Sequence, residues 1–198
     1  MCLIPSPDSS DRQISAKMKS IPLYAFAAVL FIASAVPRAA AQNQQTNNKK
    51  TPMTPQEISD RMEIEALLVR YCYAVDDRNW NTYRDVFTPD AVIDDSAAGG
   101  FRGGVEEHVK FMQKALSKIK ISQHAISTTQ LKISGDEATA RTHCSCPMVV
   151  DLGKGQTQVF LQGLWYRDRL VRTTSGWRLK ERVEEGYWNY NVPAGFKF

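Results

Sequence analysis

The sequence contains little of several residues that define common protein classes. Its 198 residues include only 11 Gly, 9 Pro and 4 Cys, too few for a collagen-like chain, a Pro- and Gly-rich disordered chain or a framework of disulfides. The excess of positive charge is only +4, and no basic run of the kind that contacts nucleic acid is present. Hydrophobic residues make up 43% of the chain, so we expect one globular core and no nucleic-acid partner.

One long apolar run lies near the N-terminus, from Ile21 to Val36. Two lysines precede it and three alanines ending at Ala41 follow it, which is the pattern of a secretory signal peptide. The run is shorter than the roughly 20 residues of a spanning helix. We therefore expect residues 1–41 to be an N-terminal extension and signal peptide, cleaved after Ala41. The protein would then be secreted or periplasmic with no stable membrane span, the alternative being a retained N-terminal anchor.

The remaining 157 residues have the size of one domain and a net charge of +2. Residues 42–53 are dominated by Gln, Asn and Lys and predict a flexible tether. The domain is expected at 54–193, followed by a short C-terminal tail at 194–198. A charge so close to zero fits a small hydrophobic molecule as partner better than a polyanion.

Helical spacing of apolar residues indicates three helices in the first half of the domain. The first spans residues 54–76, opens with a capping box, and counts Ile58 and Met62 among its predicted buried residues. A second, short amphipathic helix is expected at 80–87 and a third at 105–119.

After these helices the spacing changes to that of strands. Four segments rich in Thr, Val, Ile and aromatic residues cover 123–134, 137–150, 156–173 and 177–188, with glycine-containing turns between them. A further short strand is expected at 91–95. Three helices followed by a long antiparallel meander predict an α+β fold. The helices would pack on one face of a strongly curved antiparallel sheet and enclose a pocket.

Motifs that specify chemistry are scarce. No glycine-rich phosphate loop or nucleophile elbow is present. The sharpest metal candidate is His143 beside Cys144 and Cys146, but neighbouring residues of a strand point to opposite faces, so we expect no metal there. The odd number of cysteines after removal of the signal argues against a disulfide framework and leaves open one bridge to Cys72.

Two ionisable residues are placed to meet in an apolar pocket. Asp76 ends the first helix, and His124 opens the first long strand. A neutral imidazole is a base near pH 7, and a carboxylate on its other nitrogen would fix its tautomer. Each residue also has a simpler interpretation, Asp76 as a turn cap and His124 as a satisfied core histidine. His108 lies on a helical apolar stripe and is expected only to pack.

Short segments spread over the domain carry a resemblance to a known family. They are Arg61-Met62-Glu63-Ile64, Leu67-Leu68, Arg70-Tyr71, Asp76-Asp77-Arg78-Asn79-Trp80, Phe87-Thr88-Pro89-Asp90-Ala91, Gln123-His124-Ala125-Ile126-Ser127, Gly135-Asp136-Glu137-Ala138, Tyr166-Arg167-Asp168-Arg169-Leu170 and Gly176-Trp177-Arg178. In this order and spacing the chain resembles the SnoaL-like family of the nuclear transport factor 2-like superfamily. The resemblance implies a cone-shaped α+β barrel, commonly assembled as a homodimer or trimer.

Within that superfamily the chain looks most like the branch of scytalone dehydratase, bile-acid 7α-dehydratase and lindane dehydrochlorinase. Those enzymes place an Asp after the first helix and a His at the start of a long strand, and Asp76 and His124 match the two positions. Tyr71 matches a tyrosine that lines the pocket of the bile-acid enzyme. The resemblance therefore implies a cofactor-independent lyase or isomerase, dehydratase-like or dehydrohalogenase-like, acting on a small apolar cyclic substrate. The dehydratases carry a second acidic or imidazole group where this chain has Cys146-Pro147-Met148, which leaves the leaving-group acid unassigned.

A departing hydroxide or halide, or an enolate, also needs a cation or a hydrogen-bond donor. Arg169 and Arg172 on the third long strand are candidates, although each is otherwise a surface charge. Tyr71 is a candidate donor, and His143 is a further pocket candidate. The same residues admit a second hypothesis, a noncatalytic protein that binds a small hydrophobic ligand. An association module that dimerises through its sheet is a third and is compatible with either.

Overall fold

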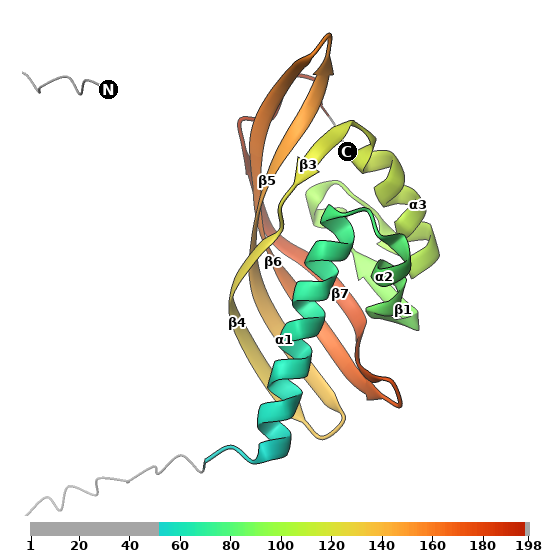
Figure 1. Ribbon diagram of the computed structural model, residues 1–198, viewed down its shortest axis with the longest axis vertical. Helices are drawn as coiled ribbons and strands as arrows, with labels where there is room; N and C mark the ends of the chain where they lie inside the picture. The colour runs from blue at the N-terminus through green and yellow to red at the C-terminus, as the bar shows by residue number, and fades with distance from the viewer. Residues whose placement is uncertain (1–51, 197–198) are drawn as a thin grey trace, which may run out of the picture. The chain divides into compact units, whose positions relative to one another are not determined.

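The computed structural model describes residues 52–196 (Figure 1). The expected signal peptide at 1–41 and nearly all of the expected tether lie outside the described residues. Within residues 52–196, no helix is long and apolar enough to cross a membrane.

The elements follow one another in two groups, helices with short strands first and long strands second. They are α1 Pro55–Asp76, α2 Trp80–Asp85, β1 Phe87–Asp94, the 3-10 turn η1 Ser96–Ala98, β2 Arg102–Gly103, α3 Val105–Ala115, the 3-10 turn η2 Leu116–Lys118, β3 Ile119–Ser122, β4 Ala125–Ser134, β5 Glu137–Gly153, β6 Gln156–Thr173 and β7 Gly176–Tyr190.

The seven strands form one curved, mixed sheet in the order β2-β1-β7-β6-β5-β3, and β4 also pairs with β5. Figure 1 shows the helices on the concave side of this sheet. The expected α+β fold with helices on a strongly curved sheet is confirmed. The sheet is not closed, and it is not wholly antiparallel as predicted, because β1 runs parallel to β7. This pairing joins strands that are far apart in the sequence, so no local sequence pattern predicts it.

The first helix begins as predicted. The Thr54 hydroxyl accepts a hydrogen bond from the Glu57 backbone N–H at 3.2 Å, and the Glu57 carboxylate accepts one from the Thr54 N–H at 2.6 Å. Its buried face is rotated from the predicted one, however. Ile58 and Met62 are 44% and 66% exposed, whereas Asp60 is buried. The prediction that these two apolar residues are core residues is therefore wrong.

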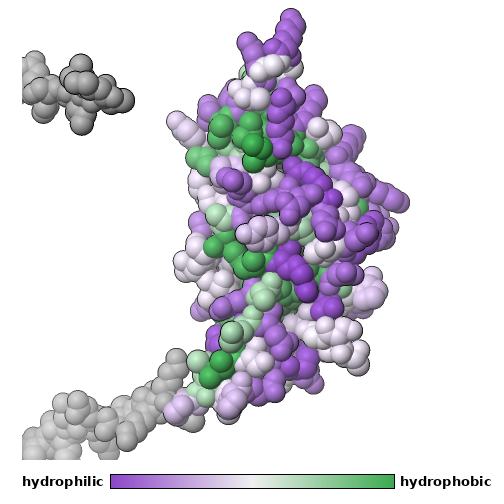
Figure 2. Space-filling model, viewed as in Figure 1, coloured by the Kyte–Doolittle hydropathy of each residue, from purple (hydrophilic) through white to green (hydrophobic). Residues whose placement is uncertain are grey.

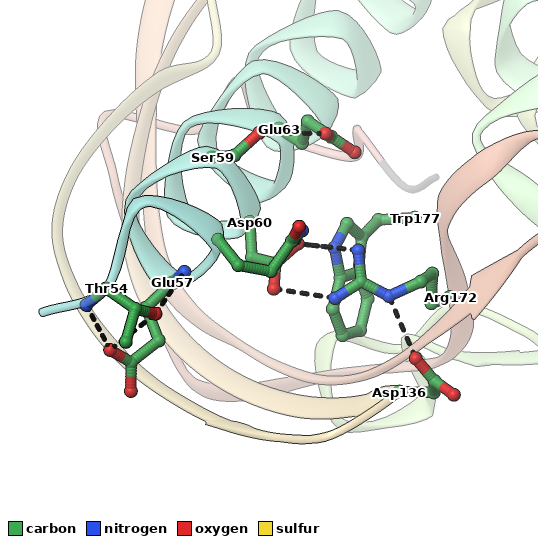
Figure 3. A network of polar contacts seen from close by, with 9 residues as sticks. Thr54, Glu57, Ser59, Asp60, Glu63, Asp136, Arg172 and Trp177 are labelled. Carbon is green, nitrogen blue, oxygen red and sulfur yellow. Dashed lines mark hydrogen bonds and ion pairs between the residues drawn. The ribbon is translucent and has the colours of Figure 1, made fainter.

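Asp60 is buried because residues of β6 and β7 supply its carboxylate with hydrogen-bond donors (Figure 3). Arg172 of β6 donates from both terminal nitrogens to the Asp60 carboxylate at 2.6 Å, and the Trp177 ring N–H donates to it at 3.2 Å. These hydrogen bonds, led by those of Arg172, hold the pKa of Asp60 at about 2 although burial opposes the shift. Arg172 also pairs with Asp136 at 2.9 Å. The cluster fastens the start of α1 to β6 and β7.

Two predicted helix ends shift by a few residues. The helix expected at 80–87 ends at Asp85, and Phe87 already belongs to β1, where it pairs with Leu179 of β7. The strand expected at 91–95 therefore begins four residues earlier. The helix expected at 105–119 ends at Ala115, and Ile119 begins β3. In each case pairing with another strand takes residues that helical spacing alone assigns to the helix.

Figure 2 shows hydrophilic residues over most of one face of the domain, with hydrophobic residues in separate patches between them. Separate patches of this kind are ordinary on a folded surface. The candidate site lies instead in the interior, between the helices and the concave face of the sheet.

Candidate active site

The structure brings Asp76 and His124 into contact. Asp76 is the last residue of α1, and His124 lies between β3 and β4. The His124 backbone N–H donates to Asp76 Oδ2 at 2.8 Å, and His124 Nδ1 lies 2.6 Å from Asp76 Oδ1. Because a carboxylate only accepts, we assign the ring proton to Nδ1. Nε2 then carries the free lone pair, and it makes no hydrogen bond within residues 52–196.

Asp76 is the ionised partner of this pair. Burial pushes its pKa up, but the hydrogen bonds that Asp76 accepts from His124 outweigh burial, so the pKa of Asp76 lies below its ordinary value. The side chains of Asp76 and His124 are only 17% and 10% exposed, which strengthens their interaction relative to water. The turn-cap interpretation of Asp76 does not describe this geometry, since the backbone N–H of Asp77 makes the capping bonds of the helix.

Arg78 holds the two segments of the pair together. Its backbone adopts the left-handed region, with φ of 57°, which turns the chain away from the end of α1. Its guanidinium donates to the Val75 carbonyl at 2.5 Å, to the Ser122 hydroxyl at 2.9 Å and to the Ile119 carbonyl at 3.4 Å. The end of α1 is thereby tied to β3, directly before His124.

Cys146 lies beside the pair but is not arranged as a nucleophile. Its Sγ is 3.6 Å from His124 Nδ1, the nitrogen that already binds Asp76. Burial raises the pKa of the Cys146 thiol well above its ordinary value, so it stays protonated. Cys72 and Cys144 are also free thiols, and the possible bridge to Cys72 is absent from the described structure.

His124 lines a cavity between the helices and the inner face of the sheet. Its volume of about 70 Å³ has room for about five water molecules. The walls come from α1, α3, the segment after β1 and the inner faces of β5, β6 and β7, and many of them are apolar or aromatic. The ionisable side chains that line it are Tyr71, Asp95, His108, His124, Cys146, Tyr166, Arg182 and Glu184.

Arg182 is the cation of this cavity. Its Nε and Nη2 each donate to the Asp168 carboxylate at 2.8 Å, in a pair that is almost fully buried. The guanidinium carbon lies 4.0 Å from the ring centroids of both Tyr71 and Tyr166. Although burial opposes it, Asp168 keeps the pKa of Arg182 well above its ordinary value. Its third nitrogen, Nη1, has no hydrogen-bond partner among the described residues, which leaves one donor available to a ligand.

Tyr71 lines the cavity, as the resemblance implies. Burial raises the pKa of its phenol well above the ordinary value, so the group remains an O–H donor.

A second histidine–aspartate pair lines the same cavity. His108 Nε2 lies 3.1 Å from the Asp95 carboxylate, and His108 Nδ1 lies 2.8 Å from the Tyr83 hydroxyl. Asp95 also accepts the Phe101 backbone N–H at 2.5 Å. The sequence indicated only packing for His108. A helical stripe shows that this side chain is buried, but it does not show which distant carboxylate meets it.

Glu184 is the other group that sequence reasoning missed. It lies on β7 two residues after Arg182 and points to the same, inner side of the sheet. Burial raises its pKa to about 8, the negative charge of Asp95 adds to the shift, and Arg182 opposes it. The only signal in the sequence is an alternation of charges along β7, and a strand with a solvated face has the same pattern.

Three predicted site residues lie away from the cavity, which corrects the expectation that they bind substrate. Arg169 is on the outer face of β6, with its side chain 57% exposed and 3.9 Å from Glu181. Arg172 belongs to the Asp60 cluster. His143 faces outward between two buried residues, and its Nδ1 lies 3.1 Å from the Ser127 hydroxyl. The two-residue period of a strand turns Arg169 and His143 away from the inner face. Arg172 has the inward parity, but it lies at the end of β6, where it binds Asp60 of α1 and does not line the cavity.

Among residues 52–196, no group of three or more His, Cys, Asp or Glu side chains is arranged to hold a metal ion.

Comparisons with known proteins agree with the fold. A model of the SnoaL-like domain matches residues 56–183, and the chain belongs to this family. Relatives from Mycobacterium tuberculosis and Mycobacterium bovis are 41% identical over 128 residues, which cover 65% of this chain and 86% of theirs; both are uncharacterized. The resemblance predicted from the sequence is thus confirmed.

Solved structures share the same architecture. A protein from Kribbella flavida is 25% identical, with a TM-score of 0.61 over 68% of this chain and 95% of its own. A protein from Novosphingobium aromaticivorans, provisionally assigned as a scytalone dehydratase, is 18% identical, with a TM-score of 0.60 over 74% of this chain and 100% of its own. A type 2 hexachlorocyclohexane dehydrochlorinase is 16% identical, with a TM-score of 0.56 over 70% and 96% of the two chains.

Proposed function

We propose that the protein is a cofactor-independent lyase or isomerase in which His124, oriented by Asp76, removes a proton from a small apolar cyclic substrate. The observation that carries the proposal is the geometry of His124. Its Nδ1 is engaged by a carboxylate at 2.6 Å, and its Nε2 has no partner among the described residues while the side chain lines a cavity. This is the arrangement that a general base requires.

Each polar group of the cavity has a role in such a reaction. When His124 takes a proton from carbon, the imidazolium that forms is stabilised by the Asp76 carboxylate. The electron pair left on the substrate needs positive charge or hydrogen-bond donors nearby. Arg182 offers the unpartnered Nη1, and Tyr71 offers a phenol O–H. Arg182 therefore takes the place that Arg169 and Arg172 held in the sequence-based hypothesis.

The walls of the cavity support the choice of substrate. Many of them are apolar or aromatic, which favours an apolar substrate. The volume of about 70 Å³ is smaller than the roughly 150 Å³ of a cavity that holds benzene, so the cavity must widen to admit a ring. The solved structures of the same fold include a dehydrochlorinase and a provisionally assigned dehydratase, so this architecture accommodates elimination chemistry in other proteins.

The test is a turnover screen of the purified protein against cyclic ketones that carry a hydroxyl or a chlorine β to the carbonyl. We expect the wild-type protein to eliminate water or chloride from a member of the panel, and D76N to lose this activity. D77N is the matched control, because Asp77 is exposed and caps the helix through its backbone. Equal activity of D76N and wild type would contradict the role of the pair.

A noncatalytic binding protein predicts another outcome of the same screen. A ligand would bind without turnover, and H124A would retain its affinity. That result would replace the enzyme hypothesis by the binding hypothesis.

A further inference from the structure

We propose that Glu184 is the proton donor of the cavity and delivers a proton to a leaving hydroxyl group while His124 removes a proton from carbon. The inference rests on the proposed function and names the group that the sequence left unassigned. It favours a substrate that loses water over one that loses halide, because a halide departs without a proton whereas hydroxide is a poor leaving group.

The position of Glu184 is the first support. Glu184 pairs with Tyr166 across β6 and β7, lines the same cavity as His124, and makes no hydrogen bond with any side chain of residues 52–196. The next residue, Glu185, faces outward and pairs with Arg141 at 2.7 Å. One carboxyl of this strand is thus held in a surface ion pair, and its neighbour is left free inside the cavity.

The surroundings of Glu184 keep its proton in place. The ionisable groups that share the cavity are Asp95 after β1, His108 on α3, Tyr71 on α1, His124 before β4, Cys146 on β5, Tyr166 on β6 and Arg182 on β7. The negative charge of Asp95 disfavours a second carboxylate nearby, and the Arg182 charge that opposes this effect is already shared with Asp168. With its pKa raised to about 8, Glu184 is mostly a carboxylic acid at pH 7.

Asp95 acts here as a positioning residue. It accepts hydrogen bonds from His108 and from the Phe101 backbone, so its charge is held in place in the cavity that Glu184 also lines. His108 is in turn held by the Tyr83 hydroxyl. The pair of His108 and Asp95 thereby keeps Glu184 protonated as an acid, whereas Asp76 orients His124 as a base.

The other cavity groups are poorer proton donors. Burial raises the pKa of the phenols of Tyr71 and Tyr166, and of the thiol of Cys146, well above their ordinary values. Arg182 does not release a proton in a protein. Glu184 is therefore the one carboxylic acid among the cavity groups that is free of other partners in the described chain.

The proposed step balances. His124 Nε2 takes the proton from the carbon next to the carbonyl, and the C–H electron pair forms the new C=C bond. The bond between the neighbouring carbon and the hydroxyl oxygen breaks, and the oxygen keeps both electrons. That oxygen takes the proton of Glu184 and leaves as water. Afterwards His124 is protonated and Glu184 is a carboxylate, and one proton moves from the first to the second through water to restore the site.

The experiment compares two leaving groups on one ring, with 3-hydroxycyclohexanone, 3-chlorocyclohexanone and their ring-substituted homologues as probes. The variants are E184Q, which keeps the shape but cannot give up a proton in the same way, and E185Q as the matched control. We expect E184Q to lose roughly 10²–10⁴-fold in kcat/KM for the hydroxy compound and to retain turnover of the chloro compound. E185Q should retain both.

Two results overturn the role of Glu184 and leave the proposed function standing. One is an E184Q variant as active as wild type on the hydroxy compound, and the other is an equal loss on both compounds, which marks a structural role. A wild-type protein that turns over neither compound contradicts the proposed function instead. An infrared difference spectrum of wild type against E184Q at pH 7 gives a readout without substrate. The carboxylic-acid C=O band of Glu184 should be present, and its absence overturns the inference.

Discussion

The two histidine–aspartate pairs of this cavity contain the same groups and differ in what remains free. His124 uses one ring nitrogen for Asp76 and leaves the other without a partner in the described chain. His108 uses both ring nitrogens, one for Asp95 and one for the Tyr83 hydroxyl. The first pair keeps a lone pair available for chemistry, whereas the second is saturated.

Contact between an imidazole and a carboxylate is therefore not enough to identify a base. His108 is also the more deeply buried of the two histidines, with 2% of its side chain exposed against 10% for His124. A buried histidine with both nitrogens bonded contributes to stability. A lining histidine with one free nitrogen is available to a substrate.

The largest effect is expected when the His124 imidazole is removed and activity is measured. H124A should lower kcat/KM on any substrate found in the screen by roughly 10²–10⁴-fold, since the base is gone. H143A is the matched control, because His143 faces outward on β5, and it should behave like wild type. A fully active H124A would show that the free nitrogen has no catalytic role.

For stability we expect the opposite order, with a larger effect at His108 than at His124. H108F leaves the buried Asp95 and Tyr83 without their shared partner, and we expect a loss of about 2–3 kcal/mol in the free energy of unfolding. H124A should cost less, because Asp76 can be reached by water. Urea unfolding gives the free energy of unfolding of both variants, and a larger decrease in H124A than in H108F would contradict the prediction.

A third prediction concerns Glu184, the carboxyl without a histidine. Its pKa of about 8 lies above the ordinary value of 4.5, so the folded state holds this proton more tightly than the unfolded state does. Its contribution to stability is therefore complete below about pH 4.5 and is lost as the pH rises to about 8. E184Q has no carboxyl to titrate at this position. Between pH 5 and pH 8 the Tm of wild type should therefore fall relative to that of E184Q, and above pH 8 the difference in Tm should stay constant. A constant difference in Tm would show that the pKa is not raised.

The smallest effect is expected at Gly100, which lies against the side chain of Asp95 in the second histidine–aspartate pair. A Cβ at this position would lie 2.6 Å from the carboxyl carbon of Asp95, so G100A should push that side chain out of place at a cost of about 1 kcal/mol. A97S, in the same exposed loop, is the control. Thermal unfolding gives the Tm of both variants. A G100A variant with the Tm of wild type would mean that the loop carrying Asp95 accommodates the extra methyl group without cost.

Much of the fold follows from local patterns. The capping box at Thr54 sets the start of α1, and the turn glycines separate β4, β5, β6 and β7 close to the predicted boundaries. Cap and turn chemistry act within a few residues, so a sequence displays them. The exposure of Ile58 and Met62 and the burial of Asp60 could not be seen this way, because Arg172 and Trp177 lie more than a hundred residues away.

The candidate site divides in the same manner. Asp76, His124 and Tyr71 stand at recognisable positions, the end of a helix, the start of a strand and a point five residues before the helix end. Arg182 and Glu184 have no such marker, since a charged residue on a strand is inward or outward according to register. The strand period also placed Arg169 and His143 on the outer face.

The sequence alone was enough to predict the α+β fold class, the main helix and strand boundaries, the family and the two residues of the first histidine–aspartate pair. Cap geometry, turn residues and hydrophobic periodicity are local and leave a readable trace. Only the tertiary structure decided that β1 joins β7, that His108 meets Asp95, and that Arg182 and Glu184 share the cavity with His124. These contacts join distant parts of the chain, and their energy depends on burial and on neighbouring charge, which no short stretch of sequence contains.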